Sequence, residues 1–406
     1  MTGVDVYEPK EDSFLILKHI KNFAKNKTVL DLGTGTGILA IEAAKYAKKV
    51  YAVDISKKAL AVAKQNAKKA NAKNITFLRS DLFSAFKQKA EKKLRFDLIL
   101  FNPPYLPTDP SEPKELALQI TGGKHGYELV ERFFQDVSSF LNPNSVILLV
   151  FSTLTKKHKV DKIIEEHCFI ADELDRKKLF FETIFLYKII KSRFLKDAEK
   201  HGLKQVIYFT KGKRGWIYKA NYKGKQVCIK RKIPQSAALK TIENEAKYLK
   251  LLNRYGIGPK FYFKTKNYLV IEFVDGKPIE EFIKSTDDAE LIKKVLFIIF
   301  KKCRKLDQLK INKEEMHHPR KHIIVGLRKK KLIVTLIDFE RAHKTQKPKN
   351  VTQFCQYLIS TKMIGLLEEK GIFIDKGVML QKAREYKHNP TKKNFKQILK
   401  EIRFSP

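Results

Sequence analysis

Cysteine is scarce in this sequence of 406 residues, and no two of the four cysteines form a Cys-X-X-Cys pair. This spacing argues against a zinc ribbon or a disulfide framework and favours a reducing, cytoplasmic environment. Long apolar runs are also missing. A run such as Val146 to Phe151 is far shorter than the roughly 18 residues that a membrane-spanning helix needs. No membrane segment is therefore expected.

The first residues, MTGVDVYEPKED, are acidic and contain Pro9, whereas a secretory signal has a basic run followed by an apolar one. Export is therefore not expected. Hydrophobic residues make up 43% of the chain, and glycine and proline are few, 18 and 14. This composition is typical of globular domains with real cores, and the length favours at least two of them.

Acidic residues are few relative to basic ones: 44 against 83, which gives a net charge of +39. Division at residue 190 leaves +8 in the first part and +31 in the second. Such asymmetry indicates two modules with different partners, so we expect domains at residues 1–190 and 191–406. The charged segment 188–205 is predicted to be a connecting helix or linker. The basic second domain favours RNA or the ribosome as a partner, although a generally lysine-rich proteome would explain the charge equally well.

Short strand-like runs alternate with helix-like runs in the first half. This alternation predicts a doubly wound α/β domain with a parallel sheet. Strands are expected at 27–32, 50–53, 75–78, 96–101, 145–151 and 180–187, and helices at 37–47, 57–70 and 127–140. Sheets of this kind bind ligands at the carboxyl ends of their strands.

The segment VLDLGTGTGILA places three glycines between a predicted strand and a predicted helix. Residues without side chains permit a tight turn and the close approach of a ligand. Asp54 ends the second predicted strand, where its carboxylate can accept hydrogen bonds from ribose hydroxyls. Asp81 ends the third and would lie near an adenine. The predicted cofactor contacts are Asp31, Gly33, Thr34, Gly35, Gly37, Asp54, Ile55, Asp81, Leu82 and Asn102.

This loop lacks the longer Gly-X-Gly-X-X-Gly pattern of dinucleotide folds. Ile38 stands at the start of the helix, where a dinucleotide fold would hold a pyrophosphate. S-adenosylmethionine (AdoMet) is therefore favoured over a nicotinamide cofactor.

The sequence FDLILFNPPYLPT ends a predicted strand in Asn102, Pro103, Pro104 and Tyr105. The two prolines fix the backbone and have no N–H to donate. The Asn102 side-chain oxygen and the Pro103 carbonyl can accept both hydrogens of a planar NH₂ group and aim its nitrogen at a methyl donor, while Tyr105 stacks on it. Such catalysis depends on positioning and preorganised polar groups, and needs no catalytic histidine.

On these motifs the first half resembles class I AdoMet-dependent methyltransferases, and most of all the HemK-like glutamine methyltransferases of the archaeal and eukaryotic release-factor branch. The resemblance covers residues 5–190 and includes VYEPKEDSFLIL (Val6 to Leu17), GGKHG (Gly122 to Gly126) and KLFFETIFLYKI (Lys178 to Ile189). It implies methylation of the glutamine amide nitrogen in the GGQ loop of a class 1 translation release factor. It also implies a small zinc-binding activator subunit that covers an apolar edge.

Asn-Pro-Pro-Tyr also serves enzymes that methylate the exocyclic amine of adenine in RNA or DNA. These four residues do not separate the two substrates. The YEPKED segment favours glutamine, because its resemblance is to the release-factor branch. By itself, the same segment predicts only a helix start, with Pro9 ahead of Asp12 or Ser13 as the N-cap.

The second half contains KGKRGWIYKANYKGKQVCIKRK, which predicts a hairpin and a third strand. Gly212 and Gly215 would form a loop over phosphates, and Lys230 would bind a phosphate. Glu245, fifteen residues further on, could pair with Lys230 as protein kinases require. In LIVTLIDFERA, Asp338 follows a strand where kinases hold Mg²⁺.

These residues resemble the small atypical kinases that include the RIO family and the kinase of the KEOPS complex, over residues 203–345. The resemblance implies a kinase-like α+β domain that binds ATP and Mg²⁺. Glu340 replaces the glycine of the Asp-Phe-Gly motif, and the catalytic loop lacks its usual aspartate and asparagine. Glu315 or His317 could supply the base, and His322 the asparagine position. An active kinase and an inactive binding or docking module both stay open.

His317, His318 and His322 also suggest a metal site, but Pro319 would break a shared helix and no other ligand stands at suitable spacing. Trp216 and its neighbouring tyrosines could stack on bases, although packing within a hairpin is the simpler interpretation.

Overall fold

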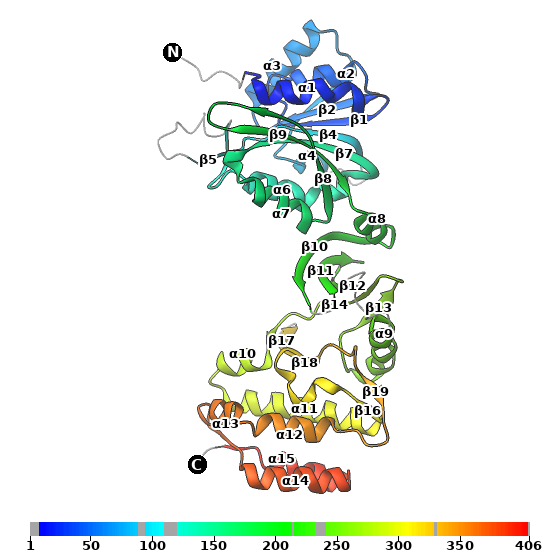
Figure 1. Ribbon diagram of the computed structural model, residues 1–406, viewed down its shortest axis with the longest axis vertical. Helices are drawn as coiled ribbons and strands as arrows, with labels where there is room; N and C mark the ends of the chain where they lie inside the picture. Colours follow the sequence, from blue (N-terminus) through cyan, green and yellow to red (C-terminus); the bar gives the residue numbers. More distant parts are fainter. Residues whose placement is uncertain are drawn as a thin grey trace. The chain divides into compact units, whose positions relative to one another are not determined.

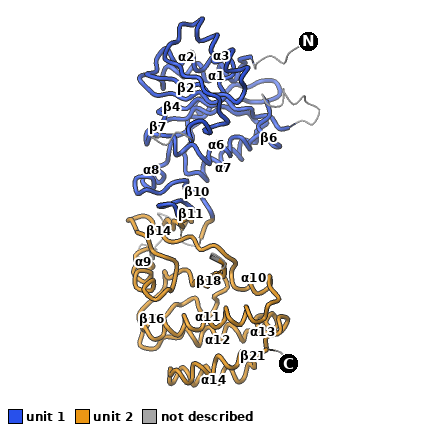
Figure 2. The backbone as a smooth tube through the Cα atoms, turned by 180° about the vertical axis from the view of Figure 1, so that it is seen from behind, with its two compact units in different colours: residues 1–209, 219–225 blue, residues 210–218, 226–406 orange. Residues whose placement is uncertain are grey.

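The computed structural model describes residues 8–87, 94–108, 120–212, 215–232, 241–328 and 331–404. The chain divides into two compact units, residues 1–209 with 219–225 and residues 210–218 with 226–406 (Figure 2). The first unit therefore extends past the boundary expected at residue 190, and the assignment of separate functions to 1–190 and 191–406 stays a prediction. Within the described ranges, no helix is both long and apolar enough to cross a membrane.

A seven-stranded sheet with the order β3-β2-β1-β4-β7-β9-β8 forms the centre of the first unit. Neighbouring strands from β3 to β7 are parallel, and β9 runs antiparallel to both β7 and β8. The strands are β1 (Thr28–Leu32), β2 (Lys49–Asp54), β3 (Ile75–Arg79), β4 (Phe96–Phe101), β7 (Leu141–Ser152), β8 (Phe169–Lys178) and β9 (Thr183–Lys191). The buried apolar residues of β1, β4 and β7 are typical of strands covered on both faces.

Helices cover both faces of this sheet, with α1, α2 and α3 on one side and α6 and α7 on the other (Figure 1). They are α1 (Glu11–Ala24), α2 (Ile38–Ala44), α3 (Lys57–Lys69), α4 (Ser84–Lys87), α6 (Glu128–Val137), the 3₁₀-helices η1 (Ser138–Phe140) and η2 (Thr153–Thr155), and α7 (Lys157–Glu166). Buried residues of α1 such as Leu15, Ile16 and Ile20 join the core that β1, β4 and β7 share. The opposite face holds a cluster of aromatic rings, in which the centroids of the tilted pair Phe101 and Phe133 lie 4.6 Å apart. The predicted Rossmann-like α/β fold of the first half is confirmed.

Helix α1 begins at Glu11 with Lys10 as its N-cap. The prediction that Asp12 or Ser13 caps the helix was wrong, because both residues lie buried in its first turn.

The last strand predicted at 180–187 exists as β9, but it begins at Thr183 and ends at Lys191. Residues 179–182 form the turn between β8 and β9, in which the Leu179 N–H donates to the Glu182 carbonyl (2.8 Å). Strand β8, an edge strand rich in exposed charges, was not predicted.

The segment 188–205, predicted to be a connecting helix or linker, contains the end of a strand and a helix. Strand β9 runs to Lys191, and helix α8 (Arg193–Lys200) follows it. Lys191 is buried, and its ammonium lies 2.6 Å from a Glu199 carboxylate oxygen. Phe194 and Leu195 are buried as well. Helix α8 is thus packed through an apolar face and an ion pair, neither of which the sequence reasoning anticipated.

A five-stranded sheet with the order β10-β11-β12-β14-β13 follows in the chain. Its strands are β10 (Leu203–Lys211), β11 (Gly215–Tyr222), β12 (Lys225–Lys232), β13 (Phe261–Lys264) and β14 (Tyr268–Glu272). Helix α9 (Thr241–Leu252) lies between β12 and β13 in sequence. The predicted hairpin and third strand are confirmed.

The rest of the second unit is mainly helical. A three-stranded sheet (β15-β17-β18) and two-stranded pairs accompany the helices. The elements are the 3₁₀-helix η3 (Asn253–Tyr255), β15 (Lys277–Pro278), α10 (Ile279–Lys284), α11 (Ala289–Gln308), β16 (Ile311–Asn312), η4 (Glu314–His317), η5 (Pro319–Lys321), β17 (Ile323–Arg328), β18 (Lys331–Leu336), β19 (His343–Lys344), α12 (Asn350–Leu358), α13 (Thr361–Glu368), β20 (Ile372–Phe373), α14 (Lys376–His388), α15 (Lys392–Lys400) and β21 (Arg403–Phe404). One apolar core joins α9 to α11, α12 and α14.

Candidate active site

The strand order of the first sheet reverses between β1 and β4. Strands β2 and β3 lie on one side of β1, and β4 and β7 on the other. Ligands of open α/β sheets bind at this point, beyond the carboxyl ends of the strands. Leu32 is in register with Phe101, so the residues that follow β1 and β4 start side by side. The fold therefore brings the glycine loop and the Asn-Pro-Pro-Tyr turn, predicted separately, to one edge.

The glycine loop is held in place by backbone contacts. The N–H groups of Gly33 and Thr34 both donate to the Val53 carbonyl at the end of β2 (2.9 Å each). The loop needs glycine because Gly33, Gly35 and Gly37 all have positive φ, at 75°, 54° and 86°. At Gly37 an added Cβ would also lie 3.0 Å from the Ala63 Cβ of α3.

Asp31 lies at the base of this loop and is completely buried. Its Oδ2 atom accepts hydrogen bonds from the Thr34 hydroxyl (2.6 Å) and the Ala40 N–H (3.1 Å). Its Oδ1 atom is buried without a hydrogen-bond partner among the described residues. Burial raises the pKa of Asp31 to about 7, although the hydrogen bonds from Thr34 and Ala40 act in the opposite direction. An unpaired buried carboxylate oxygen suits a cationic ligand.

Asp54 ends β2 and contacts the glycine loop, Ile55 follows it, and Asp81 lies two residues beyond the end of β3. Asp54 Oδ2 accepts the Gly35 N–H (3.0 Å) and Oδ1 accepts the Ser56 N–H (2.8 Å), so this carboxylate braces the loop before any ribose binds. The remaining lone pairs of the Asp54 carboxylate can still accept hydrogen bonds from ribose hydroxyls. Ile55 is 51% exposed, which leaves an apolar surface for a flat base. Asp81 is paired with Arg132 at 2.7 Å, and the following residue, Leu82, has a φ of 45°.

Asn102 follows β4, and its amide is oriented by a residue that the sequence reasoning took for a helix cap. Asn102 Nδ2 donates to the buried Ser13 hydroxyl of α1 at 3.2 Å. Asn102 Oδ1 is buried without a partner within the described part of the chain. The hydrogen bond to Ser13 therefore leaves the oxygen as a preorganised acceptor. Since 89 positions separate the two residues, no local sequence signal could have revealed this contact.

The GGKHG run packs against the backbone of Asn-Pro-Pro-Tyr. A Cβ at Gly122 would lie 2.6 Å from the Pro104 carbonyl oxygen, and one at Gly126 would lie 2.4 Å from that of Tyr105. The strands β5 (Leu106–Pro107) and β6 (Thr121–Gly123) pair next to this contact. These glycines are therefore needed for close packing that fixes the turn, which explains the motif structurally.

A second group of predicted residues comes together in the second unit. The Lys230 ammonium lies 2.8 Å from both carboxylate oxygens of Glu245 and 3.7 Å from Asp338 Oδ1. Glu245 is only 1% exposed. Burial acts to lower the pKa of Lys230, but the carboxylates of Glu245 and Asp338 outweigh it and hold the pKa above its ordinary value. The three residues come from β12, α9 and the segment after β18.

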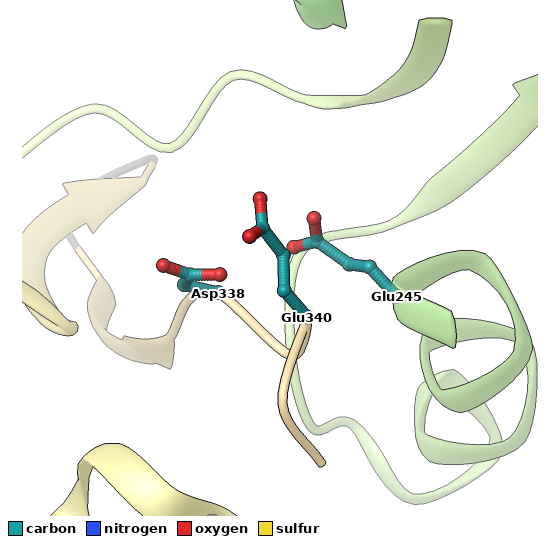
Figure 3. A group of neighbouring side chains, drawn as sticks. All are labelled: Glu245, Asp338 and Glu340. Carbon is teal, nitrogen blue, oxygen red and sulfur yellow. The ribbon is translucent and has the colours of Figure 1, made fainter. Parts of the chain in front are cut away.

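Glu245, Asp338 and Glu340 could together hold a metal ion (Figure 3). One carboxylate oxygen of each lies within 4.8 Å of those of the other two. Helix α9 is tied to this segment, because Asn244 Nδ2 donates to the carbonyls of Glu340 and Ala342 (2.8 Å each). Burial acts to raise the pKa of Asp338, but nearby Lys230 and Lys313 hold it below the usual value.

Lys313 was missed by the sequence analysis. It is fully buried, its ammonium lies 2.9 Å from Glu315 Oε2, and it also donates to the Asp338 carbonyl. Burial lowers the pKa of this lysine, with the neighbouring carboxylates opposing. His322 Nδ1 lies 3.6 Å from Asp338 Oδ2, so His322 and Glu315 both reach this cluster.

Other predicted residues lie less centrally. Gly212 and Gly215 close the turn between β10 and β11, where the Gly212 N–H donates to the Gly215 carbonyl (2.9 Å), while positions 213 and 214 lie outside the described residues. His317 ends η4 and Pro319 starts η5, so the predicted break at Pro319 is confirmed. The Arg231 guanidinium covers the Trp216 ring at 5.2 Å, in line with packing inside the hairpin.

By fold and strand order the first unit is a Rossmann-like, class I, AdoMet-dependent methyltransferase domain. A family model described as "Methyltransferase domain" matches residues 23–212. A putative protein N5-glutamine methyltransferase of Methanocaldococcus jannaschii is 40% identical over 185 residues, which are 45% of this chain and 90% of that protein. Through its N-terminal half, the chain belongs to the HemK-like family of protein glutamine methyltransferases.

Other relatives match the same half. Human methyltransferase HEMK2 is 28% identical over 46% of this chain and 91% of its own length. The eRF1 methyltransferase catalytic subunit mtq2 of Schizosaccharomyces pombe is 27% identical over 46% and 89%. Among solved structures, the Mtq2–Trm112 complex of E. cuniculi matches at 27% identity with a TM-score of 0.37, over 47% of this chain and all of that one.

The raised pKa of Asp31 predicts a pH dependence of AdoMet binding. AdoMet is cationic, so it should bind the ionised carboxylate, and its Kd should rise up to about tenfold per pH unit below pH 7. Asp31→Asn should weaken binding and flatten this profile. Titration calorimetry on both sides of pH 7 measures the effect.

Folding stability should respond in the opposite sense to AdoMet affinity. The pKa of Asp31 in the folded chain lies above its ordinary value of 3.8, so this group makes the ligand-free protein progressively less stable as the pH rises from 3.8 to about 7. Asp31→Asn should therefore lose AdoMet affinity without losing thermal stability at alkaline pH. A steep pH profile that persists in Asp31→Asn would contradict this role.

Proposed function

We propose that the first unit methylates the side-chain amide nitrogen of a glutamine in a protein, and that the substrate is the GGQ loop of a class 1 translation release factor. The observation that carries the proposal is the Asn102 amide, whose nitrogen is engaged by Ser13 and whose oxygen is a buried acceptor without a partner among the described residues. Membership of the glutamine methyltransferase family supports the amide over other acceptors.

The residues at the sheet edge where the strand order reverses, between β1 and β4, fit AdoMet as the methyl donor. The glycine loop would hold the amino acid part beside the unpaired Asp31 oxygen, and Asp54 and Asp81 would contact ribose and adenine. When bound, AdoMet supplies a methyl group on a positively charged sulfur. These contacts stay predictions, as does the Pro103 carbonyl as the second acceptor.

The chain's own part in the reaction is to aim a weak nucleophile. The amide nitrogen of glutamine is planar and its lone pair is delocalised, so it attacks slowly in solution. Asn102 Oδ1 and the Pro103 carbonyl would accept its two hydrogens, which fixes the plane of the amide and stabilises the positive charge that develops on nitrogen. Tyr105 would cover the amide. No general base is needed before the methyl transfer.

Adenine in RNA or DNA is the alternative acceptor, because Asn-Pro-Pro-Tyr fits both. Incubation with labelled AdoMet and either purified release factor or total RNA separates the two. Label in the release factor, lost when its GGQ glutamine is replaced, supports the proposal. Label in RNA alone would overturn it.

Ser13→Ala should lower kcat about tenfold, because Asn102 would lose the partner that fixes the orientation of its amide. The KM for AdoMet should stay unchanged. Ser13→Thr keeps a hydroxyl and should restore most of the rate. Steady-state kinetics of the three proteins test this role, and an unchanged kcat in Ser13→Ala would contradict it.

A small zinc-binding activator subunit is proposed as a partner. The relative in Schizosaccharomyces pombe is named a catalytic subunit, which supports a multi-subunit arrangement. β3 ends the order of the first sheet, and its Ile75, Phe77 and Leu78 are only half buried. Such an edge strand is open to pairing with another chain. If this edge binds the activator subunit, Phe77→Lys should abolish co-purification of that subunit.

RNA or ribosome binding by the basic second half stays a separate prediction.

For the second unit we propose a kinase-like domain that binds ATP with Mg²⁺. The specific observation is the Lys230–Glu245 pair, formed between the third strand of a five-stranded sheet and the next helix, with Asp338 beside it. Kinases use this lysine–glutamate pair on phosphates and this aspartate on Mg²⁺. Glu315, held by Lys313, would act as the base if the domain transfers phosphate.

A further inference from the structure

Two phenylalanines stand almost fully in solvent at the turn between β8 and β9. The side chains of Phe180 and Phe181 are 93% and 87% exposed, and their rings contact each other at 4.7 Å in an edge-to-face arrangement. Two-residue hairpin turns normally carry glycine, asparagine or aspartate. Folding therefore gives no reason for two aromatic rings at these positions, and their exposure costs solubility.

The sheet topology puts this turn on the same edge as the methyl-acceptor site. Ile184 near the start of β9 is in register with Ser152, the last residue of β7. Since β7 and β4 are parallel, the turn lies at the edge where Asn102 follows β4. In Figure 1 the turn and β5, which follows Asn-Pro-Pro-Tyr, lie on the same side of the unit.

The 3₁₀-helix η2 links the two features directly. The Thr183 N–H donates to the Thr153 hydroxyl (3.1 Å), and the Thr155 hydroxyl donates to the Tyr105 carbonyl (3.2 Å). Between these two contacts, Leu154 is 42% exposed. We call the three exposed apolar residues along this hydrogen-bonded connection, Leu154, Phe180 and Phe181, the Phe-Phe rim.

We infer that the Phe-Phe rim docks the polypeptide that carries the acceptor glutamine, and so makes the first unit select a folded protein over a short peptide. This inference rests on the proposed glutamine methyltransferase function. Aromatic side chains contribute disproportionately to protein–protein binding when a partner covers them. A polypeptide is favoured over nucleic acid because the edge-to-face rings and the aliphatic Leu154 do not form a stack of parallel ring faces.

The test compares two substrates with the double variant Phe180→Ala/Phe181→Ala. With full-length release factor, kcat/KM should fall at least about tenfold, mainly through KM. With a short peptide that carries the GGQ sequence, kcat/KM should change less than about twofold. AdoMet affinity and the melting temperature should stay the same, because the rings pack on little else.

Ile170→Ala is the matched control. Ile170 is 48% exposed and lies on β8 at the opposite end of the same hairpin, in register with Ile190. The Ile170→Ala variant should show an unchanged kcat/KM with full-length release factor and with the short peptide.

Two outcomes overturn the inference. One is an unchanged KM for release factor in the double variant, and the other is a loss confined to binding or methylation of RNA. If the wild-type protein does not methylate release factor at all, the proposed function fails before the rim is tested, so the two failures are distinguishable.

Discussion

Asn102→Ala is expected to reduce the rate of methyl transfer about 10²- to 10³-fold, the usual effect of removing one preorganised polar group at a reacting centre. The variant loses the buried acceptor oxygen and leaves the Ser13 hydroxyl without its donor. AdoMet affinity should fall far less than the rate, because the glycine loop is held by β2 and by Asp54 and Asn102 is only one of ten predicted cofactor contacts. Single-turnover kinetics with labelled AdoMet measure the transfer step.

Asp31→Asn and Asn102→Ala should affect different steps of the reaction. Asp31→Asn should act mainly on AdoMet binding, whereas Asn102→Ala should act mainly on the chemical step. Near-normal turnover in Asn102→Ala, or a parallel loss of AdoMet affinity, would show that Asn102 does not act as the acceptor.

Lys230→Met is expected to weaken the binding of ATP with Mg²⁺ to the second unit by about 10- to 100-fold. The ammonium would bind phosphate, and it also neutralises Glu245, which is 1% exposed. Breaking a buried ion pair can cost about 3–5 kcal/mol of stability, so loss of binding in this variant needs a check by thermal unfolding. Calorimetric titration with and without Mg²⁺ measures the affinity.

Asp338→Asn is the companion variant, because it keeps the shape of the side chain and the Lys230–Glu245 pair. It should reduce only the Mg²⁺-dependent part of ATP binding. Release-factor methylation should be unaffected in both variants, since neither residue belongs to the methyltransferase site. If the wild-type protein binds no ATP in the presence of Mg²⁺, the kinase-like assignment fails and a docking role remains for the second unit.

The methyltransferase fold could be predicted because its signals are local. The three loop positions with positive φ favour glycine, and Asp31, Asp54 and Asn102 lie in or directly after short apolar strands. Each motif stands at the carboxyl end of its strand, so the rule for parallel sheets was enough to bring them together.

Features set by tertiary contacts were missed. Strand β8 was missed because it is an edge strand with a largely exposed surface, and most of its residues are charged rather than apolar. The segment 188–205 predicted only a connecting helix or linker because it is charged, whereas Lys191 is buried against Glu199. The contact of Ser13 with Asn102 was not predicted because the two residues are distant in sequence. The buried position of Lys313 was not predicted because a lysine is normally exposed.

The most direct test of this account is tandem mass spectrometry of a class 1 release factor after incubation with the full-length protein, AdoMet and any co-purified activator subunit. We expect one added methyl group on the amide nitrogen of the GGQ glutamine, present with the wild-type protein and absent with Asn102→Ala. An unmodified glutamine together with methylated adenine in co-incubated RNA would contradict it.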